Sequence, residues 1–315
     1  MTSCEWLTVS GLILLLAAGV CAQEGPAITA PAPDYDAEIP TLIAGFVFED
    51  TESDGLRGPQ EPGVPGVSVT DGFTVVATDE AGRYELTPSP DAVFIALTRP
   101  AGYDVNGYWY APLADEVDFA LTATDGDADV FTFIHLSDNH LSDLAASHEG
   151  LTRFVDEVNA LSPPPAFVFN TGDLVNCSKQ LTTPVEHAQR YFDTYAEMMG
   201  ELRVPWYNVA GDHADVGYRM EQFPRTDFRC GKAMYWEHFG PHYFSFEYGN
   251  LHILSIDAVY KGGDDKEYNE KHWGRDTMLP GLRCSRSCRS HSRCAGSIVA
   301  RPQCFSLYSL SSPPL

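Results

Sequence analysis

The apolar positions of the first half of the chain come in short runs with an alternating, strand-like spacing. These runs cover residues 42–48, 67–70, 74–77, 84–86 and 93–98. Gly, Pro, Asp and Asn stand between them, as is typical of turns that join strands. No segment with a helical repeat interrupts them. Because a sheet must cover its apolar face, this pattern predicts a small all-β sandwich over residues 41–125.

From residue 130 onward the pattern changes to strands that alternate with helices. Strand-like runs cover residues 130–136, 166–170 and 206–209, and segments with a helical repeat cover residues 149–161 and 184–202. Such alternation is typical of βαβ units. We therefore predict a layered α/β domain, an α/β sandwich over residues 130–282, that is preceded by the small all-β sandwich.

The N-terminus carries an apolar run from Leu7 to Cys21, followed by the small residue Ala22. This arrangement is typical of a secretory signal peptide, which we assign to residues 1–22 with cleavage before Gln23. Residues 23–40 are rich in Ala, Pro and Asp and are interpreted as a linker. The run is shorter than the ~20 residues that span a bilayer. We therefore expect a secreted or periplasmic protein with no stable membrane insertion; the sequence does not set its oligomeric state.

The formal net charge is −24. A surface this negative repels phosphate backbones and anionic lipid, which argues against nucleic acid as a partner. The charge changes abruptly near the C-terminus, because residues 283–315 hold no acidic residue, five Arg and four of the eight Cys. We interpret these residues as an aberrant tail that arises from a frame error or a truncated gene model, with a genuine disordered tail as the alternative.

Three short motifs, each directly after a strand-like run, carry the candidate chemistry. They are Asp138-Asn139-His140, Gly172-Asp173 and Gly211-Asp212-His213. Each follows the previous one by about one βαβ unit of 30 or more residues. Parallel strands direct their C-terminal ends to one edge of a sheet, where ligands bind. Ionised carboxylates and neutral imidazoles gathered there suit Zn, Mn or Fe.

At these motifs the sequence resembles the calcineurin-like metallophosphoesterase family. The resemblance lies in residues 134–140, 170–173 and 210–213, and continues through residues 239–246 and the strand from Leu251 to Ile256. Residues 78–84 are similar to the β-sandwich that precedes the catalytic domain in one bacterial branch of that family. Together the similar segments extend over about residues 41–259.

The resemblance implies a role for each motif residue. Asp138 and His140 would bind a first divalent metal ion, Asp173 would bridge two ions, and Asp212 would bind the second. His213 would contact the scissile phosphate and help to protonate the leaving oxygen. The family usually has Asn where this chain has Asp212, which adds one negative charge. The cofactors implied are two divalent metal ions (Mn, Fe or Zn), and the partner implied is a small phosphoester, whether monoester, diester or nucleotide.

The family completes its metal site with a later His and a Gly-His-x-His segment, and this sequence holds neither. After Asp257 only His272 and His291 remain, and neither has the expected neighbours. A site without these imidazoles is expected to bind metal weakly. The alternative interpretation is therefore a catalytically inactive, secreted binding or surface protein that uses its β-sandwich.

A second ion site is predicted in the β-sandwich. Asp50, Glu52, Asp54, Gly55 and Glu61 stand at positions 1, 3, 5, 6 and 12 of a calcium-loop pattern. The flanking segments are strand-like, so this would be a calcium-stapled β-domain. The alternative is an ordinary acidic turn in a very acidic protein.

Overall fold

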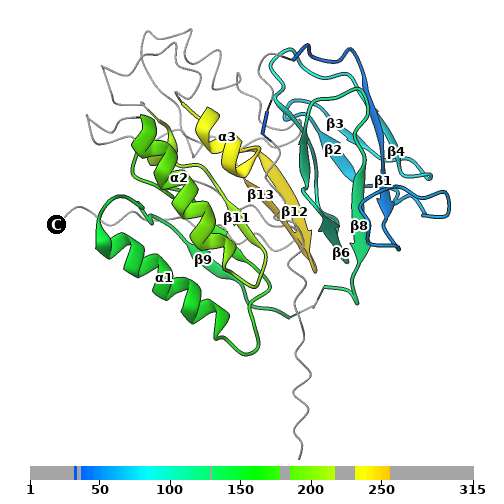
Figure 1. The fold of residues 1–315 in the computed structure, drawn as a ribbon. Helices are drawn as coiled ribbons and strands as arrows, with labels where there is room; N and C mark the ends of the chain where they lie inside the picture. The colour runs from blue at the N-terminus through cyan, green and yellow to red at the C-terminus, as the bar shows by residue number, and fades with distance from the viewer. Residues whose placement is uncertain (1–31, 34–36, 128–129, 178–184, 217–230, 256–315) are drawn as a thin grey trace, which may run out of the picture.

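The fold is described here from a computed structural model of the chain, which describes residues 32–33, 37–127, 130–177, 185–216 and 231–255. Its N-terminal part is built of strands alone, and its second part combines strands with helices (Figure 1). The fold-class prediction is therefore confirmed. The predicted signal peptide and tail lie outside the described residues.

Two four-stranded sheets form the N-terminal sandwich. The strands are β1 (Ile43–Glu49), β2 (Ser68–Thr70), β3 (Val75–Ala77), β4 (Arg83–Leu86), β5 (Phe94–Leu97), β6 (Tyr103–Asn106), β7 (Tyr110–Pro112) and β8 (Phe119–Ala123). One sheet has the order β4-β1-β8-β6 and the other β3-β2-β5-β7. In β4 the buried Tyr84 and Leu86 alternate with exposed residues, as expected for a strand with one face in a core.

Strand β5 is buried on both faces, because its two faces belong to different cores. Ile95 and Leu97 pack inside the sandwich. Phe94 and Ala96 pack against the second domain, in the same cluster as residues of its helices. The β-sandwich and the α/β domain therefore share a continuous apolar interface.

The α/β domain is arranged around a parallel three-stranded sheet of order β11-β10-β9. Its elements are β9 (Ile134–Leu136), α1 (Ala145–Asn159), β10 (Val168–Asn170), α2 (Val185–Gly200), β11 (Trp206–Asn208), a 3₁₀ turn η1 (Asp212–Ala214), α3 (Ala233–Phe239), β12 (Phe244–Tyr248) and β13 (Leu251–Ser255). Val168 of β10 packs with the helices. Phe167 and Phe169 pack on the opposite side with β12 and β13. The sheet is thus covered by helices on one face and by the antiparallel pair β12–β13 on the other.

The observed elements differ from the predicted ones mainly at their ends. The strand predicted from Val130 begins only at Ile134, and the Val130 side chain is 91% exposed. The helix predicted from Glu149 begins four residues earlier, at Ala145. The prediction omits this first turn because its residues carry no apolar repeat. Strands β6, β7, β8 and β12 and helix α3 were not predicted; they are short, and β6 includes an Asn and β7 a Pro.

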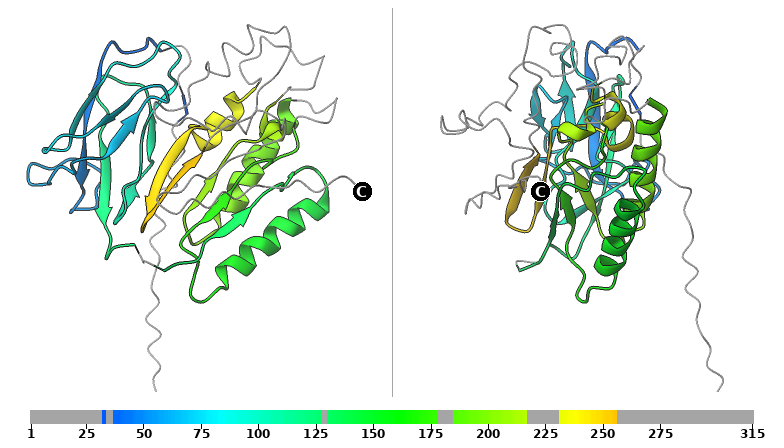
Figure 2. Two further views of the ribbon diagram at one scale, coloured as in Figure 1. Left: turned by 180° about the vertical axis from the view of Figure 1, so that it is seen from behind. Right: turned by 90° about the vertical axis from the view of Figure 1, so that its left-hand side faces the viewer.

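One arginine joins the two domains. The backbone C=O of Arg99 accepts a hydrogen bond from the N–H of Glu247 in β12 at 2.8 Å, and its guanidinium donates to the C=O of the same residue at 2.6 Å. The guanidinium also lies 3.0 Å from Asp104 and 3.1 Å from Asp127. The hairpin of β12 and β13 therefore lies between the helical layer and the sandwich (Figure 2).

None of the helices in the described ranges combines the length and the apolar character that a membrane span requires.

Candidate metal centre

The three loops that carry the motifs stay hydrogen-bonded to one another beyond the ends of their strands. The N–H of Asp138 donates to the C=O of Gly172 at 3.1 Å, and the N–H of His140 donates to the C=O of Asp173 at 2.9 Å. The N–H of Asp173 in turn donates to the C=O of Ala210 at 3.2 Å. The loops therefore continue the order of the sheet and bring the motifs to its C-terminal edge, as the sequence predicts.

The five side chains predicted from the sequence gather at this edge. His140 Nε2 lies 3.6 Å from Asp138 Oδ1 and 3.9 Å from Asp173 Oδ2. The His140 and His213 rings are 4.3 Å apart between centroids, and the Asp212 carboxyl is hydrogen-bonded to that of Asp173. His140, Asp173 and His213 each bring one potential ligand atom within 4.8 Å of the other two. His213 therefore stands within reach of a metal ion, beyond the phosphate-contacting role that the resemblance implies.

The backbone at this site adopts unusual conformations. Four non-glycine residues in the described part of the chain have positive φ, and three of them are Asp138 (57°), His140 (47°) and Asp173 (55°). Such conformations cost about 1–3 kcal/mol each and persist only where the surroundings enforce them. Their concentration in the motif residues marks this edge as a candidate functional site by a criterion that the sequence does not display.

Gly211 allows the second and third motifs to approach each other. Its φ is +88°, and a Cβ atom built there would lie 2.3 Å from the backbone N of Asp173 and 2.6 Å from its Oδ1. Both distances are shorter than any ordinary contact, so a side chain at residue 211 would displace the Asp173 carboxylate. The motif pattern includes this glycine, but only the structure gives the reason for it.

The electrostatics of the site favour a cation. Burial is the largest cause that raises the pKa of Asp173, and the negative charges of Asp212 and Asp138 also raise it. The hydrogen bond from the backbone N–H of His213 opposes the shift, and the resulting pKa is about 7. Carboxylates crowded in this way repel one another when ionised. A divalent cation would relieve that repulsion, and imidazole nitrogens with carboxylate oxygens are suitable donors for Mn, Fe or Zn. The residues present thus fit a divalent metal ion.

His213 is held in place by its neighbours. Its side chain is buried, its Nδ1 lies 3.0 Å from Asn176 Oδ1, and its backbone N–H donates to Asp173 Oδ1 at 3.1 Å. Because Asn176 occupies Nδ1, Nε2 is the nitrogen that carries acid–base or ligand chemistry. The role of Asn176 could not be read from the sequence, since nothing in its neighbours marks it.

The carboxylates of the predicted calcium loop have structural partners in the chain itself. Asp50 and Glu61 are buried, and their oxygens accept backbone N–H groups of the loop, among them that of Gly55 at 2.8 Å. Glu52 and Asp54 are exposed. Among the described residues, none of these carboxylates joins two others with oxygens within 4.8 Å. The hydrogen bonds account for how the loop closes, and calcium binding there stays a prediction.

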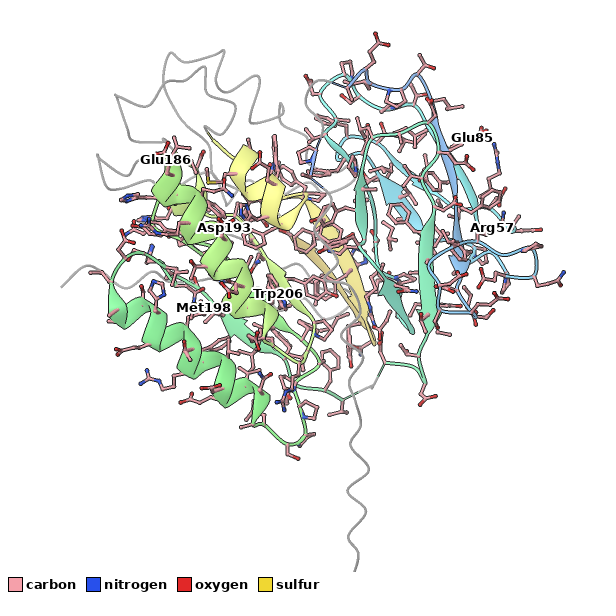
Figure 3. The ribbon with its side chains drawn as sticks, viewed as in Figure 1. Arg57, Glu85, Glu186, Asp193, Met198 and Trp206 are labelled. Atoms are coloured by element: carbon pink, nitrogen blue, oxygen red, sulfur yellow. The ribbon has the colours of Figure 1, made fainter. Side chains whose placement is uncertain are left out.

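A cavity of about 440 Å³ lies between the two domains, away from the metal residues. Arg99, Trp109 and Trp206 are among the residues that line it. Trp206, labelled in Figure 3, begins β11, whereas the motif residues follow the end of that strand. The cavity is therefore not part of the candidate metal centre.

Comparison with known families agrees with this geometry. Residues 131–282 match the family model described as calcineurin-like phosphoesterase, and residues 51–124 match the model described as the N-terminal domain of calcineurin-like phosphoesterase. No curated protein matches the chain. The family acts on phosphoesters with divalent metal ions, in agreement with the His and Asp group at the sheet edge. The chain therefore belongs to the calcineurin-like phosphoesterase family, and it carries the family's N-terminal domain ahead of the catalytic one.

Proposed function

We propose that this protein hydrolyses a small phosphoester with two divalent metal ions that are held by Asp138, His140, Asp173 and Asp212. The observation that carries the proposal is the gathering of these carboxylates and imidazoles, from three separate loops, at the C-terminal edge of one sheet. When bound, such a pair of cations holds the phosphate oxygens and lowers the pKa of an attacking water.

Asp173 is the residue best suited to bridge two ions. One of its oxygens lies 3.9 Å from His140, and its carboxyl is also hydrogen-bonded to Asp212, so it stands between the first and third motifs. Its backbone is fixed on both sides, by Ala210 and by His140. This position between the two sets of donors supports a bridging role.

We assign His213 to the leaving group. With Nδ1 hydrogen-bonded to Asn176, its Nε2 can contact the phosphate and transfer a proton to the departing oxygen. The closeness of His213 to His140 also suits a metal ligand. The variant His213→Ala separates the two roles: loss of turnover with unchanged metal content supports the acid, and loss of metal supports the ligand.

Hydrolysis of a chromogenic phosphoester with added Mn²⁺ tests the proposal. We expect turnover in the wild-type chain and near two metal ions per chain by elemental analysis when Mn²⁺ is in excess, which offsets the weak binding expected without the later imidazoles, and loss of both in Asp173→Ala. Asp156→Ala, which removes an exposed carboxylate from α1, serves as the matched control and is expected to keep full activity. Wild-type protein with no turnover and no bound metal would exclude the enzyme and favour the alternative, a binding protein that uses its β-sandwich.

We also propose that the protein is exported to the periplasm or the exterior. The apolar run from Leu7 to Cys21, with Ala22 after it, supports this assignment. Mass spectrometry of the mature protein is expected to find Gln23 at the N-terminus, and an intact Met1 would contradict export by this route.

A further inference from the structure

A chain of buried side-chain hydrogen bonds runs beneath the metal centre. The Asn170 amide donates both to Asn139 Oδ1 and to the hydroxyl of Tyr195, the latter at 2.7 Å. The Tyr195 hydroxyl donates in turn to Asn208 Oδ1 at 3.1 Å. Asn170 and Tyr195 are fully buried, and Asn208 is 5% exposed. These bonds therefore form in a region of low dielectric, where each hydrogen bond is strengthened and a missing partner is costly.

Each asparagine of this hydrogen-bond network lies in, or directly ahead of, one of the three motif loops. Asn139 lies between Asp138 and His140, Asn170 ends β10 ahead of the second motif, and Asn208 ends β11 ahead of the third. Tyr195 comes from α2, which lies over the helical face of the sheet. A single side chain from that helix thus connects, directly or through Asn170, to the three loops that carry the metal residues.

The direction of every hydrogen bond in the chain is determined. The N–H of Gly172 donates to Asn170 Oδ1 at 3.1 Å, so the amide NH₂ of Asn170 must face Asn139 and Tyr195. The Tyr195 hydroxyl has one proton, and since it accepts from Asn170, it gives that proton to Asn208. Burial raises the pKa of Tyr195 above its ordinary value, so the hydroxyl keeps its proton. These donors and acceptors therefore form one consistent set.

The backbone of the site is strained, and surrounding hydrogen bonds are needed to hold it in that conformation. Asp138, His140 and Asp173 all have positive φ, and conformations of this kind persist only where surrounding contacts enforce them. Asn170 contacts the first motif through Asn139 and the second through the N–H of Gly172. Tyr195 extends this connection to β11 through Asn208, whose backbone C=O also accepts the hydroxyl of Tyr235 at 2.8 Å.

We propose that Tyr195 is a positioning residue of the metal centre: its hydroxyl sets the separation of the strand ends that carry the three motifs, and thereby the affinity for metal. This role rests on the proposed function. Tyr195 acts through Asn170 and Asn208, to which its hydroxyl is hydrogen-bonded, while its ring packs against that of Phe239.

The variant Tyr195→Phe tests the role, because it removes the hydroxyl and keeps the ring. Mutation of an outer-shell partner commonly lowers metal affinity about 10–100-fold, and we expect a loss in that range for Mn²⁺, measured by calorimetric titration of the full chain. The matched control is Tyr84→Phe in the β-sandwich. Tyr84 is also buried, and its hydroxyl donates to the C=O of Val117 at 2.7 Å. We expect Tyr84→Phe to lower the melting temperature about as much as Tyr195→Phe does, and to leave the Mn²⁺ affinity unchanged.

Hydrogen exchange of the metal-free chain gives a readout that does not depend on metal. The reporter amides are those of Asp138, His140 and Asp173, which bond between the motif loops. We expect these amides to exchange about 10-fold or more faster in Tyr195→Phe than in the wild type, and to be unchanged in Tyr84→Phe. The Val117 amide, which donates to the C=O of Ala44, should exchange faster in Tyr84→Phe and be unchanged in Tyr195→Phe.

The outcomes separate this inference from the proposed function. If the wild type binds Mn²⁺ and both tyrosine variants bind it equally well, or if the motif amides exchange alike in both, Tyr195 has only a structural role and the inference is overturned. Wild-type protein that takes up no Mn²⁺ overturns the proposed function, and the role of Tyr195 toward metal with it.

Discussion

Two buried aspartates, Asp127 at the interface between the domains and Asp173 at the metal centre, have opposite pKa shifts. Burial raises the pKa of Asp127, but the hydrogen bond from Arg99, the backbone N–H groups of Gly249 and Gly102 and the positive charge of Arg99 outweigh it, so the pKa lies below its ordinary value. Burial first, and then the neighbouring carboxylates, Asp212 among them, together raise the pKa of Asp173 to about 7.

The difference shows what separates a structural carboxylate from a candidate metal ligand in this protein. The side chains of Asp127 and Asp173 are 4% and 12% exposed, so the burial of the side chain alone does not distinguish them. The chain itself supplies a cation for Asp127 in Arg99, whereas at Asp173 it supplies more negative charge. The first arrangement links the two domains, and in the second the carboxylates repel one another, a repulsion that a bound metal ion would relieve.

The largest expected effect comes from breaking the interface pair. Arg99→Met leaves the buried Asp127 without its cation and removes the guanidinium bond to Glu247. Removal of one partner of a buried ion pair costs about 3–5 kcal/mol, and we expect a loss of that order in the free energy of unfolding, measured with urea. Arg83→Met, which breaks an exposed pair with Glu85, is the control and should cost less than about 1 kcal/mol.

Equally small losses in the free energy of unfolding for Arg99→Met and Arg83→Met would contradict the contrast between Asp127 and Asp173. That result would mean that water reaches Asp127 and that its low exposure does not isolate it. A double variant, Arg99→Met with Asp127→Asn, should recover part of the lost stability, because it removes the uncompensated charge.

A smaller effect is expected from a side chain at the contact between the second and third motifs. Gly211→Ala forces a Cβ against Asp173 and also places Ala at φ +88°. Gly72→Ala is the matched control, because its φ is +89° and nothing lies within 4 Å of the new Cβ. The control should cost about 1 kcal/mol from its backbone conformation alone. We expect Gly211→Ala to cost about 2–3 kcal/mol by urea unfolding, because overlap adds to strain, and to weaken Mn²⁺ binding. Equal costs in the two variants would show that the loops move apart without penalty.

The last expected effect is a dependence of stability on pH in the metal-free protein. The pKa of Asp173 is raised from 3.8 to about 7 in the folded chain, so the folded state binds this proton more tightly than the unfolded state. Its contribution to stability is therefore full below about pH 4 and is lost as pH rises toward 7. We expect Asp173→Asn to remove this slope and to raise the stability of the metal-free chain at neutral pH, by at most about 4 kcal/mol for a shift of about three pKa units.

Urea unfolding of the two chains between pH 4.5 and 7.5, with a chelator present, measures the difference. The lowered pKa of Asp127 acts only below about pH 4 and does not contribute in this window. Saturating Mn²⁺ should reverse the ranking, because the wild type then gains binding energy that Asp173→Asn lacks. A flat difference curve would contradict the raised pKa of Asp173.

How far the sequence predicted the fold follows from how strongly each segment is patterned. The apolar stripe of α1 at Leu151, Val155 and Val158 repeats at helical spacing, so the helix was recognised although its first turn was not. Strand β7, with only three residues and a proline, carried no such repeat and was missed. Strand β5 is buried on all four residues because two domains contact it, and no local pattern indicates that.

By itself, the sequence determined the strongly patterned strands and helices, the change from a strand-rich region to an α/β region and the motif residues that converge at the sheet edge. Each of these follows from the local spacing of apolar residues or from short motifs placed at strand ends. The tertiary structure alone decided which charges are compensated and which are not, that Gly211 must lack a side chain, and that Tyr195 reaches two strand ends at once. These features depend on groups that are distant along the chain and close in space, and such distances arise only when the chain is packed.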